Sequence, residues 1–257
     1  MSEPLRRPHG HDTQGAALPG GRVVVAFFDV DETLVAVKSM LDFWDFWAAS
    51  GAWPVPADVP DLGALAMAGV DRTTLNREYY RRFAGVPVVT LRSAARSWYD
   101  THRRGPRAFV TAGVEAVQRH RSQGHKVVLV SGSLGSLLEA VAEDLGADEV
   151  RCAEQVVTAG GLLTGEVDRP MIGQTKADTV RTVLRERGAR RADCYAYGDH
   201  ESDLAMLRAV GHPVVVGGSP ALAREAGSAG WAVLPGALGP RGGVARTGGP
   251  VPASGNG

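Results

Sequence analysis

The sequence has few cysteines and no long apolar run, and both absences narrow the class of protein. Cys152 and Cys194 are its only cysteines, too few for a disulfide-stapled secreted domain. We expect each to be a small apolar core residue in a reducing compartment. The longest apolar runs, such as VVVAFF and KVVLV, are strand-length and far below the roughly 20 residues that cross a bilayer. Residues 1–21 lack the apolar segment of a secretory signal, so we expect a cytoplasmic protein without a membrane anchor.

An excess of one charge is also missing. Lys and Arg total 28 and Asp and Glu total 28, so the formal net charge is zero. The chain therefore has no overall field to attract nucleic acid or anionic lipid, and we expect neither as a partner. Its 257 residues, 44% of them hydrophobic, are typical of a soluble protein with one large domain, or with a core domain and a smaller partner.

Both ends of the chain are rich in glycine, proline and polar residues. This composition predicts disordered tails at residues 1–21 and 235–257. His9 and His11 lie in the first tail, where we expect solvated side chains rather than a metal site.

Between the tails, strand-length apolar runs alternate with helical patterns. Residues 23–28 form a continuous apolar run, as in a strand that is buried on both faces of a parallel sheet. Later runs include KVVLV, ADCYAY, PVVVGG and WAVL, and EQVVTAGGLLTGEV is typical of a hairpin that turns at Gly160–Gly161. The alternation predicts an α/β fold with a Rossmann-like parallel sheet.

Residues 39–107 interrupt this alternation. Met40, Phe43, Trp44 and Trp47 recur at the spacing of one helix face, and we expect them to pack in a core rather than to contact a ligand. Further helical patterns follow, with no comparably strong strand signal. We therefore predict a helical insertion at residues 39–107 (hereafter the insertion) between two core segments, 22–38 and 108–234.

Two carboxylates follow the first predicted strand. Asp29 and Asp31 are one residue apart, so their charges repel unless the site compensates them. One carboxylate can attack as a nucleophile and hold a cation, while the other works as an acid and then as a base. A divalent cation would relieve the repulsion. Taken alone, the pair equally fits an Asp-rich turn in which one carboxylate caps a helix.

Polar residues also follow later strands, at the sheet edge where open parallel sheets bind ligands. Ser131 and Gly132 end the run KVVLV, where hydroxyls, amides and a helix N-terminus can hold phosphate. Ser133 also fits an ordinary helix N-cap. Lys176 begins a helix, so it is either a solvated surface residue or a cation that neutralises a phosphoryl group.

Two acids flank the turn after ADCYAY. Asp199 offers the hard oxygen ligand that suits Mg²⁺. Asp203 can hold the surroundings of the metal or the lysine in place. Helix capping by acidic residues is the alternative.

The order strand-DxDxTL, helical insertion, strand-SGS, Lys, strand-GDxxxD resembles the haloacid dehalogenase superfamily of phosphohydrolases. An insertion directly after the first motif resembles the subclass with a C1-type cap. The stretches HKVVLVSGS, IGQTKA and YGDHESDLAMLRAVGHPVVV look like the HAD-IB hydrolases related to phosphoserine phosphatase, over about residues 22–234. The resemblance implies Mg²⁺-dependent hydrolysis of a small phosphorylated metabolite.

The resemblance also implies roles for the motif residues. Asp29 is then the nucleophile that forms an aspartyl phosphate, and Asp31 protonates the leaving oxygen and later activates water. The implied ligands of Mg²⁺ are the Asp29 carboxylate, the Asp31 main-chain carbonyl and Asp199. The phosphoryl oxygens are implied to be held by Ser131, Lys176 and the Gly132 amide. Thr33 is implied to support the loop that carries the two aspartates.

One position of the sequence bears on the identity of the substrate. Phosphoserine phosphatases have a glutamate, which reads the substrate ammonium, at the position of Lys38. A lysine there would repel an amine and attract an anion, so we expect phosphoserine to be a poor substrate and Lys38 to contact the substrate. Ser202 stands where those enzymes have asparagine. A phosphotransferase or mutase that uses the same intermediate, and a non-catalytic binding module of the same fold, remain alternatives.

Overall fold

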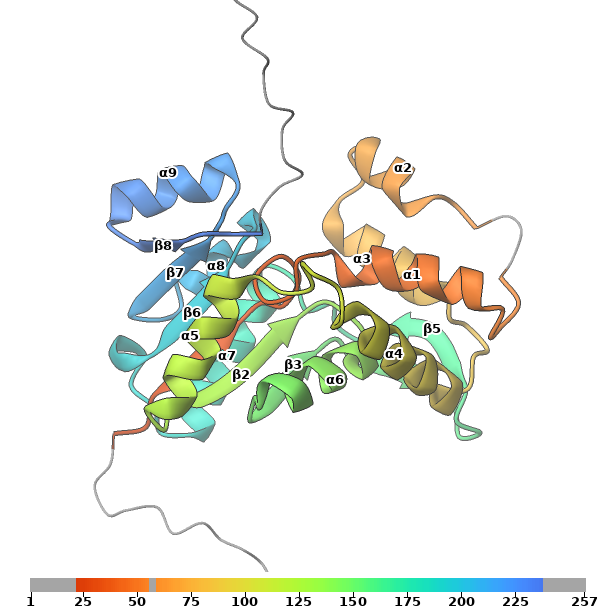
Figure 1. Cartoon of the computed structure of the whole chain (residues 1–257), viewed down its shortest axis with the longest axis horizontal. Coiled ribbons are helices and arrows are strands. Elements are labelled where there is room, and N and C mark those ends of the chain that lie inside the picture. Colours follow the sequence, from red (N-terminus) through yellow and green to blue (C-terminus); the bar gives the residue numbers. More distant parts are fainter. Residues whose placement is uncertain (1–21, 56–58, 238–257) are drawn as a thin grey trace, which may run out of the picture.

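A single six-stranded sheet forms the centre of the molecule (Figure 1). The computed structural model describes residues 22–55 and 59–237. All neighbouring strands of this sheet are parallel, in the order β3-β2-β1-β6-β7-β8. Their bounds are Val25–Phe28 (β1), Lys126–Ser131 (β2), Glu149–Cys152 (β3), Tyr195–Gly198 (β6), His212–Val216 (β7) and Ala232–Leu234 (β8). The predicted α/β fold with a Rossmann-like parallel sheet is confirmed.

Strand β1 is apolar along its whole length because both faces of the sheet are covered. All four of its residues are fully buried, as expected for a central parallel strand. Helices α5 (Thr111–Ser122) and α6 (Gly135–Leu145) pack on β2 and β3, while α7 (Gln174–Glu186) packs on α8 (Leu204–Leu207), which contacts β6 and β7. Cys194, just before β6, is buried and unpaired, as predicted for a core residue.

The chain reverses its direction of travel across the sheet at β1. It runs from β1 outward to β2 and β3 and then returns to β6, on the other side of β1. Phe28 of β1 lies beside Tyr197 of β6, and their rings stack with centroids 4.2 Å apart. The carboxyl ends of these two strands therefore lie side by side at a topological switch point, where ligands bind in open α/β sheets.

The described residues of the insertion form four helices: α1 (Ser39–Ser50), α2 (Leu62–Met67), α3 (Arg72–Arg81) and α4 (Val88–His102). In Figure 1, α1, α2 and α3 lie together at the right, away from β8 and α9. Phe43 and Trp47 are buried and pack with Phe83, so the core prediction is confirmed for these two. Trp44 is half-buried, and Met40 is half-buried and lines the cavity described below, which differs from the prediction. Helix α2 was not predicted. The boundaries of the insertion as a separate unit stay a prediction, since α4 packs on α6.

A hairpin of the core joins the insertion through backbone hydrogen bonds. Strands β4 (Gln155–Val157) and β5 (Leu163–Val167) are antiparallel, and Gly161 has a positive φ of 77° in the predicted turn. The Gly85 amide donates to the Leu163 carbonyl over 2.8 Å, and the Leu163 amide donates to the Val86 carbonyl over 2.9 Å. These bonds fix the end of α3 against the core.

Other predictions differ from the structure or fall outside it. Helix α9 (Pro220–Ala229), between β7 and β8, was not predicted. The two predicted tails, with His9 and His11, lie outside the described residues except for 235–237. Among the described residues, no helix has both the length and the apolar character to cross a membrane.

Candidate active site

A tight turn after β1 presents the two aspartates. The Asp29 amide donates to the Tyr197 carbonyl over 2.9 Å, which extends the pairing of β1 with β6. Beyond it, the Leu34 and Val35 amides both donate to the Val30 carbonyl, over 2.8 and 3.0 Å. These bonds close the turn, and they place Asp29 and Asp31 at the carboxyl end of the central strand.

Helix α5 supports this turn from behind because it has a glycine at the contact. A Cβ atom at Gly113 would overlap the Thr33 carbonyl oxygen. Close approach of a helix to another backbone requires such a small residue. The position of Thr33 thus depends on a glycine that lies 80 residues later in the chain.

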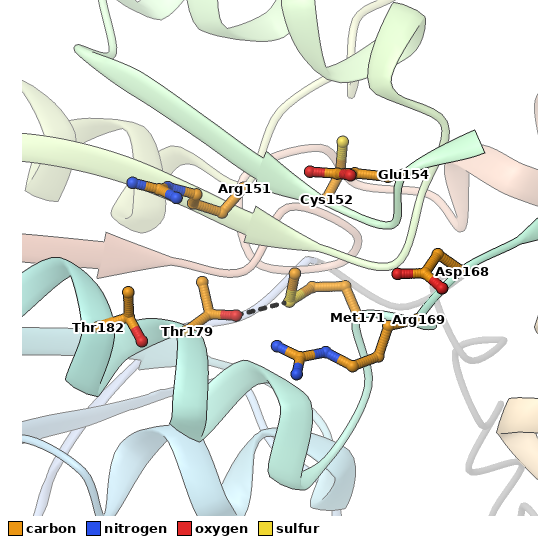
Figure 2. A pocket seen from close by; sticks show the side chains of 8 residues that line it. All are labelled: Arg151, Cys152, Glu154, Asp168, Arg169, Met171, Thr179 and Thr182. Atoms are coloured by element: carbon orange, nitrogen blue, oxygen red, sulfur yellow. Dashed lines mark hydrogen bonds between the residues drawn. The ribbon is translucent and has the colours of Figure 1, made fainter. Parts of the chain in front are cut away.

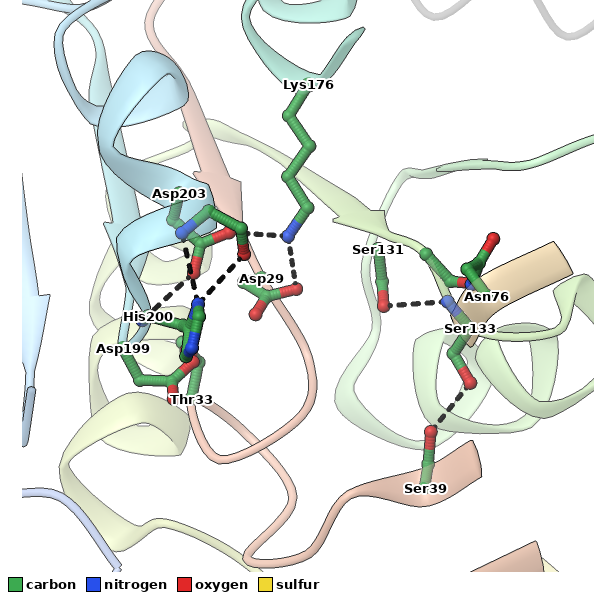
Figure 3. Close-up of polar contacts among 12 residues, drawn as sticks. Asp29, Thr33, Ser39, Asn76, Ser131, Ser133, Lys176, Asp199, His200 and Asp203 are labelled. Atoms are coloured by element: carbon green, nitrogen blue, oxygen red, sulfur yellow. Dashed lines mark hydrogen bonds and ion pairs between the residues drawn. The ribbon is translucent and has the colours of Figure 1, made fainter. Parts of the chain in front are cut away.

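Lys176 reaches the site from the first turn of α7. Its Nζ donates to Asp29 Oδ1 over 2.7 Å and to Asp203 Oδ1 over 2.6 Å, and the side chain is only 4% exposed. Figure 3 shows Lys176 extending from its helix to the two carboxylates. The alternative of a solvated surface lysine is therefore wrong.

Three carboxylates gather beside this lysine. One oxygen each of Asp29, Asp199 and Asp203 lies within 4.8 Å of the others. Thr33 Oγ1 donates to Asp199 Oδ1 over 3.2 Å, and the His200 amide donates to Asp203 Oδ2 over 3.2 Å. Thr33 therefore links the turn after β1 to the turn after β6. These oxygen donors and their spacing fit a hard divalent cation.

The carboxylates outnumber the lysine, and their acidities reflect this excess. Burial, followed by the charge of Asp203, raises the pKa of Asp29 to about 6, although Lys176 opposes the shift. Burial and then the charge of Asp29 raise the pKa of Asp31 to about 7, and burial and then Asp29 raise the pKa of Asp199 to about 8. Burial lowers the pKa of Lys176, but the charges of Asp203 and Asp29 outweigh it and raise this pKa. The site therefore favours a further positive charge.

The predicted phosphate loop follows β2. Ser131 is 2% exposed, and its Oγ accepts a hydrogen bond from the Ser133 amide over 3.2 Å. This contact leaves the hydroxyl proton of Ser131 available for an anion. Ser133 is not the helix N-cap, because α6 begins at Gly135 and its N-cap position is Leu134. The Ser133 hydroxyl instead bonds the Ser39 hydroxyl over 2.6 Å.

Helix α3 of the insertion holds this loop from the other side. Asn76 Nδ2 donates to the Gly132 carbonyl over 2.9 Å, and the Tyr80 hydroxyl contacts the Gly132 and Ser133 carbonyls at 3.2 and 3.1 Å. The Gly132 carbonyl, which Asn76 and Tyr80 bind, and the Ser133 amide, which donates to Ser131 Oγ, belong to the same peptide unit. The two side chains therefore orient the Ser131 hydroxyl. Neither residue was predicted from the sequence, although the polar Asn76 on the buried face of a helix was a signal.

Most predicted site residues line one cavity of about 310 Å³. They are Asp29, Asp31, Lys38, Ser131, Gly132 and Lys176. Asp199, Asp203 and Thr33 lie behind the Asp29 carboxylate and join it through the contacts above. Lys38 Nζ also lies 3.6 Å from Glu32 Oε2, a partner that the sequence analysis did not foresee.

A second cavity, of about 220 Å³, lies between β3, the segment before α7 and α7 itself (Figure 2). It shares Met171 with the first cavity. Its polar lining includes Arg151, Glu154, Asp168 and Arg169, and it contains no predicted site residue.

Known proteins resemble this chain in sequence and in fold. A family model described as haloacid dehalogenase-like hydrolase matches residues 26–208. A probable phosphatase of Mycobacterium tuberculosis is 32% identical over 90% of this chain and 81% of its own length. A phosphoserine phosphatase of Halobacterium salinarum is 33% identical over 75% of this chain and 85% of its own. The structure of a substrate-bound phosphoserine phosphatase complex is 18% identical, with a TM-score of 0.61 over 83% of this chain and 93% of that one.

Proposed function

Because this chain belongs to the haloacid dehalogenase-like hydrolase family, we propose that it is a Mg²⁺-dependent phosphatase of a small phosphorylated metabolite. The reaction would proceed through an aspartyl phosphate on Asp29. One observation carries the proposal: Lys176 bridges Asp29 and Asp203 in a buried site that Asp199 also enters. The phosphatase names of two relatives support it.

Asp29 is the proposed nucleophile because it is ionised and fixed in place. Its pKa of about 6 leaves it a carboxylate at neutral pH. The bond from Lys176 fixes Oδ1 of that carboxylate at the floor of the cavity. Attack on phosphorus transfers the phosphoryl group to Asp29, and the bond to the leaving oxygen breaks.

Asp31 is the proposed general acid and base. Its pKa of about 7 lets it carry a proton at neutral pH and release it to the leaving oxygen. Its Oδ1 is buried and has no hydrogen-bond partner among the described residues. After the product leaves, the deprotonated Asp31 would take a proton from the water that hydrolyses the aspartyl phosphate.

The other side chains bind the phosphoryl oxygens. Ser131 donates its hydroxyl, the Gly132 amide assists, and Lys176 supplies positive charge where negative charge accumulates. The Asp29 and Asp199 carboxylates and the Asp31 main-chain carbonyl would hold Mg²⁺. Bound there, the ion would neutralise charge on the carboxylates and on the phosphoryl group.

Phosphate release from 4-nitrophenyl phosphate tests the proposal, with Mg²⁺ and with EDTA. The wild type should turn over only with Mg²⁺, and Asp29→Asn should be inactive while its circular dichroism spectrum is unchanged. Turnover by Asp29→Asn at the wild-type rate would remove Asp29 from the nucleophile role. Transfer of phosphate to an added alcohol, in place of release to water, would identify a phosphotransferase instead.

A further inference from the structure

The cavity in front of Asp29 is larger than a phosphate group needs. Its volume is about 310 Å³, whereas a water molecule takes about 30 Å³ of liquid volume. A phosphoryl group with its oxygens corresponds to only a few such volumes. The remaining space therefore accommodates the rest of the substrate, and its lining indicates the chemistry of that part.

The insertion gives this cavity an aliphatic wall. Leu41 comes from α1, Leu62 and Ala66 from α2, Val70 from the turn after α2, and Leu75 from α3. Leu41 is 40% exposed and lines the cavity, so it is not part of the core. An aliphatic wall gains free energy when an apolar group covers it. A polar group in the same place would lose hydrogen bonds to water without replacing them.

Two cations line the same cavity in addition to Lys176, which the phosphoryl chemistry uses. They are Lys38, just before α1, and Arg72, the first residue of α3. Among the described residues, the only carboxylates in its lining are Asp29 and Asp31, which the chemistry uses. Glu32 lies 3.6 Å from Lys38 and balances part of its charge, but it does not line the cavity. A substrate ammonium would therefore meet two like charges and no spare carboxylate in the lining. An anionic group would be attracted to both cations.

We propose that the substrate is a phosphomonoester with an aliphatic body that ends in an anionic group and has no amine. The inference rests on the proposed phosphatase function and names its substrate class. It gives a role to Arg72 and to the aliphatic wall of the insertion, which the phosphoryl chemistry does not use. It also disfavours phosphoserine, which has an ammonium group and almost no aliphatic body.

Matched esters test the two parts of this proposal separately. Three six-carbon alkyl phosphates would be compared that end in a carboxylate, a methyl or an ammonium group, together with ethyl phosphate. We expect kcat/KM to fall in that order of end groups, with at least about tenfold between carboxylate and ammonium. Each buried methylene should raise kcat/KM about fourfold, from the free energy of its transfer out of water. Equal values for the three six-carbon esters, or no gain from ethyl to hexyl phosphate, would overturn the proposal.

Paired variants show which residues make the selection. Ala66→Phe narrows the cavity and should lower kcat/KM for hexyl phosphate by at least about tenfold relative to ethyl phosphate. Met67→Phe is the control, because Met67 follows on the same helix, is 92% exposed and does not line the cavity. Arg72→Gln should reduce the ratio between carboxylate and ammonium esters severalfold. Arg81→Gln, on the same helix but with Glu78 and Glu166 as its partners, should not.

Binding separates this inference from the proposed function. The three six-carbon phosphonates cannot be hydrolysed, and their affinity for the full-length chain with Mg²⁺ can be measured by calorimetry. Turnover of 4-nitrophenyl phosphate with no preference among the six-carbon esters would overturn the inference alone. Absence of turnover on every ester would refute the proposed function. The phosphonates would then decide the inference, which requires tighter binding of the carboxylate form and fails if the affinities are equal.

Discussion

The excess of carboxylates at the site should make the metal-free protein more stable when Asp199 is neutral. Asp199 has a pKa raised to about 8 by burial and by the charges of Asp29 and Asp203. Folded protein therefore binds more protons than unfolded protein from the ordinary pKa near 3.8 up to about 8. Because the folded state must lose these protons as the pH rises, stability falls across this interval.

The size of the effect follows from the shift. Between pH 5 and the Asp199 pKa of about 8, an interval of about three pH units, the folded protein carries a proton that the unfolded protein lacks. At about 1.4 kcal/mol per pH unit, the free energy of unfolding falls by at most about 4 kcal/mol up to pH 9. Asp199 is only partly buried, so solvent screens part of this electrostatic effect. We expect Asp199→Asn to gain about 1 to 2 kcal/mol over the wild type at pH 9, or a few °C in Tm at about 2–4 °C per kcal/mol. The amide oxygen can still accept the bond from Thr33.

Thermal melting in EDTA at pH 5 and pH 9 measures this difference. Asp45→Asn is the control, since Asp45 is an exposed carboxylate on α1 with no ion pair among the described residues. Melting curves of wild type and Asp199→Asn that shift in parallel with pH would refute the reasoning. Mg²⁺ should reverse the order at pH 8, because a ligand at 100 times its Kd stabilises the wild type by about 2.7 kcal/mol and the variant binds it more weakly.

Three further substitutions test other parts of the site. Asp31→Asn should lower kcat about 10²- to 10⁴-fold, as loss of a general acid does, and less for esters with good leaving groups; an equal loss across leaving groups would contradict the acid role. Tyr80→Phe removes the hydroxyl that contacts Gly132, so KM should rise about fivefold for every ester alike, from about 1 kcal/mol per hydrogen bond; a change confined to one ester would argue against it. Gly113→Ala should lower the free energy of unfolding by about 1–3 kcal/mol through overpacking, which urea unfolding can measure. An unchanged urea midpoint would contradict the close approach of α5 to the Thr33 carbonyl.

The parts of the fold that the sequence predicted are those with a local signal. The first strand reads as an uninterrupted apolar run because β1 is buried on both faces, and the motifs at strand ends are contiguous residues. Asp29 and Asp31, Ser131 and Gly132 were found for this reason. Lys176 had two interpretations from its position at a helix start, a solvated surface residue or a cation at a phosphoryl group, and the family resemblance favoured the second.

The parts that were missed depend on contacts between distant segments or on weak local patterns. Helix α2 has six residues, too few to show a helical period. Helix α9 contains Gly227 in its interior, which weakens its pattern. The bond from Asn76 to Gly132 joins residues 56 positions apart, and only the folded insertion brings them together. The ion pair of Lys38 with Glu32 depends on the conformation of the turn between them, where Glu32 has a positive φ of 57°.

Helix α3 has a part in both halves of the proposed site. Its Asn76 and Tyr80 hold the Gly132 carbonyl and so orient Ser131, while its Arg72 and Leu75 line the space for the body of the substrate. A helix is a rigid connection, so a body that displaces the first turn of α3 also strains the bonds from its later turns. A substrate that fits the first turn leaves these bonds intact. Selection of the body and binding of the phosphate are therefore coupled through one helix, and a poorly fitting ester should lose affinity for its phosphate group as well as for its body.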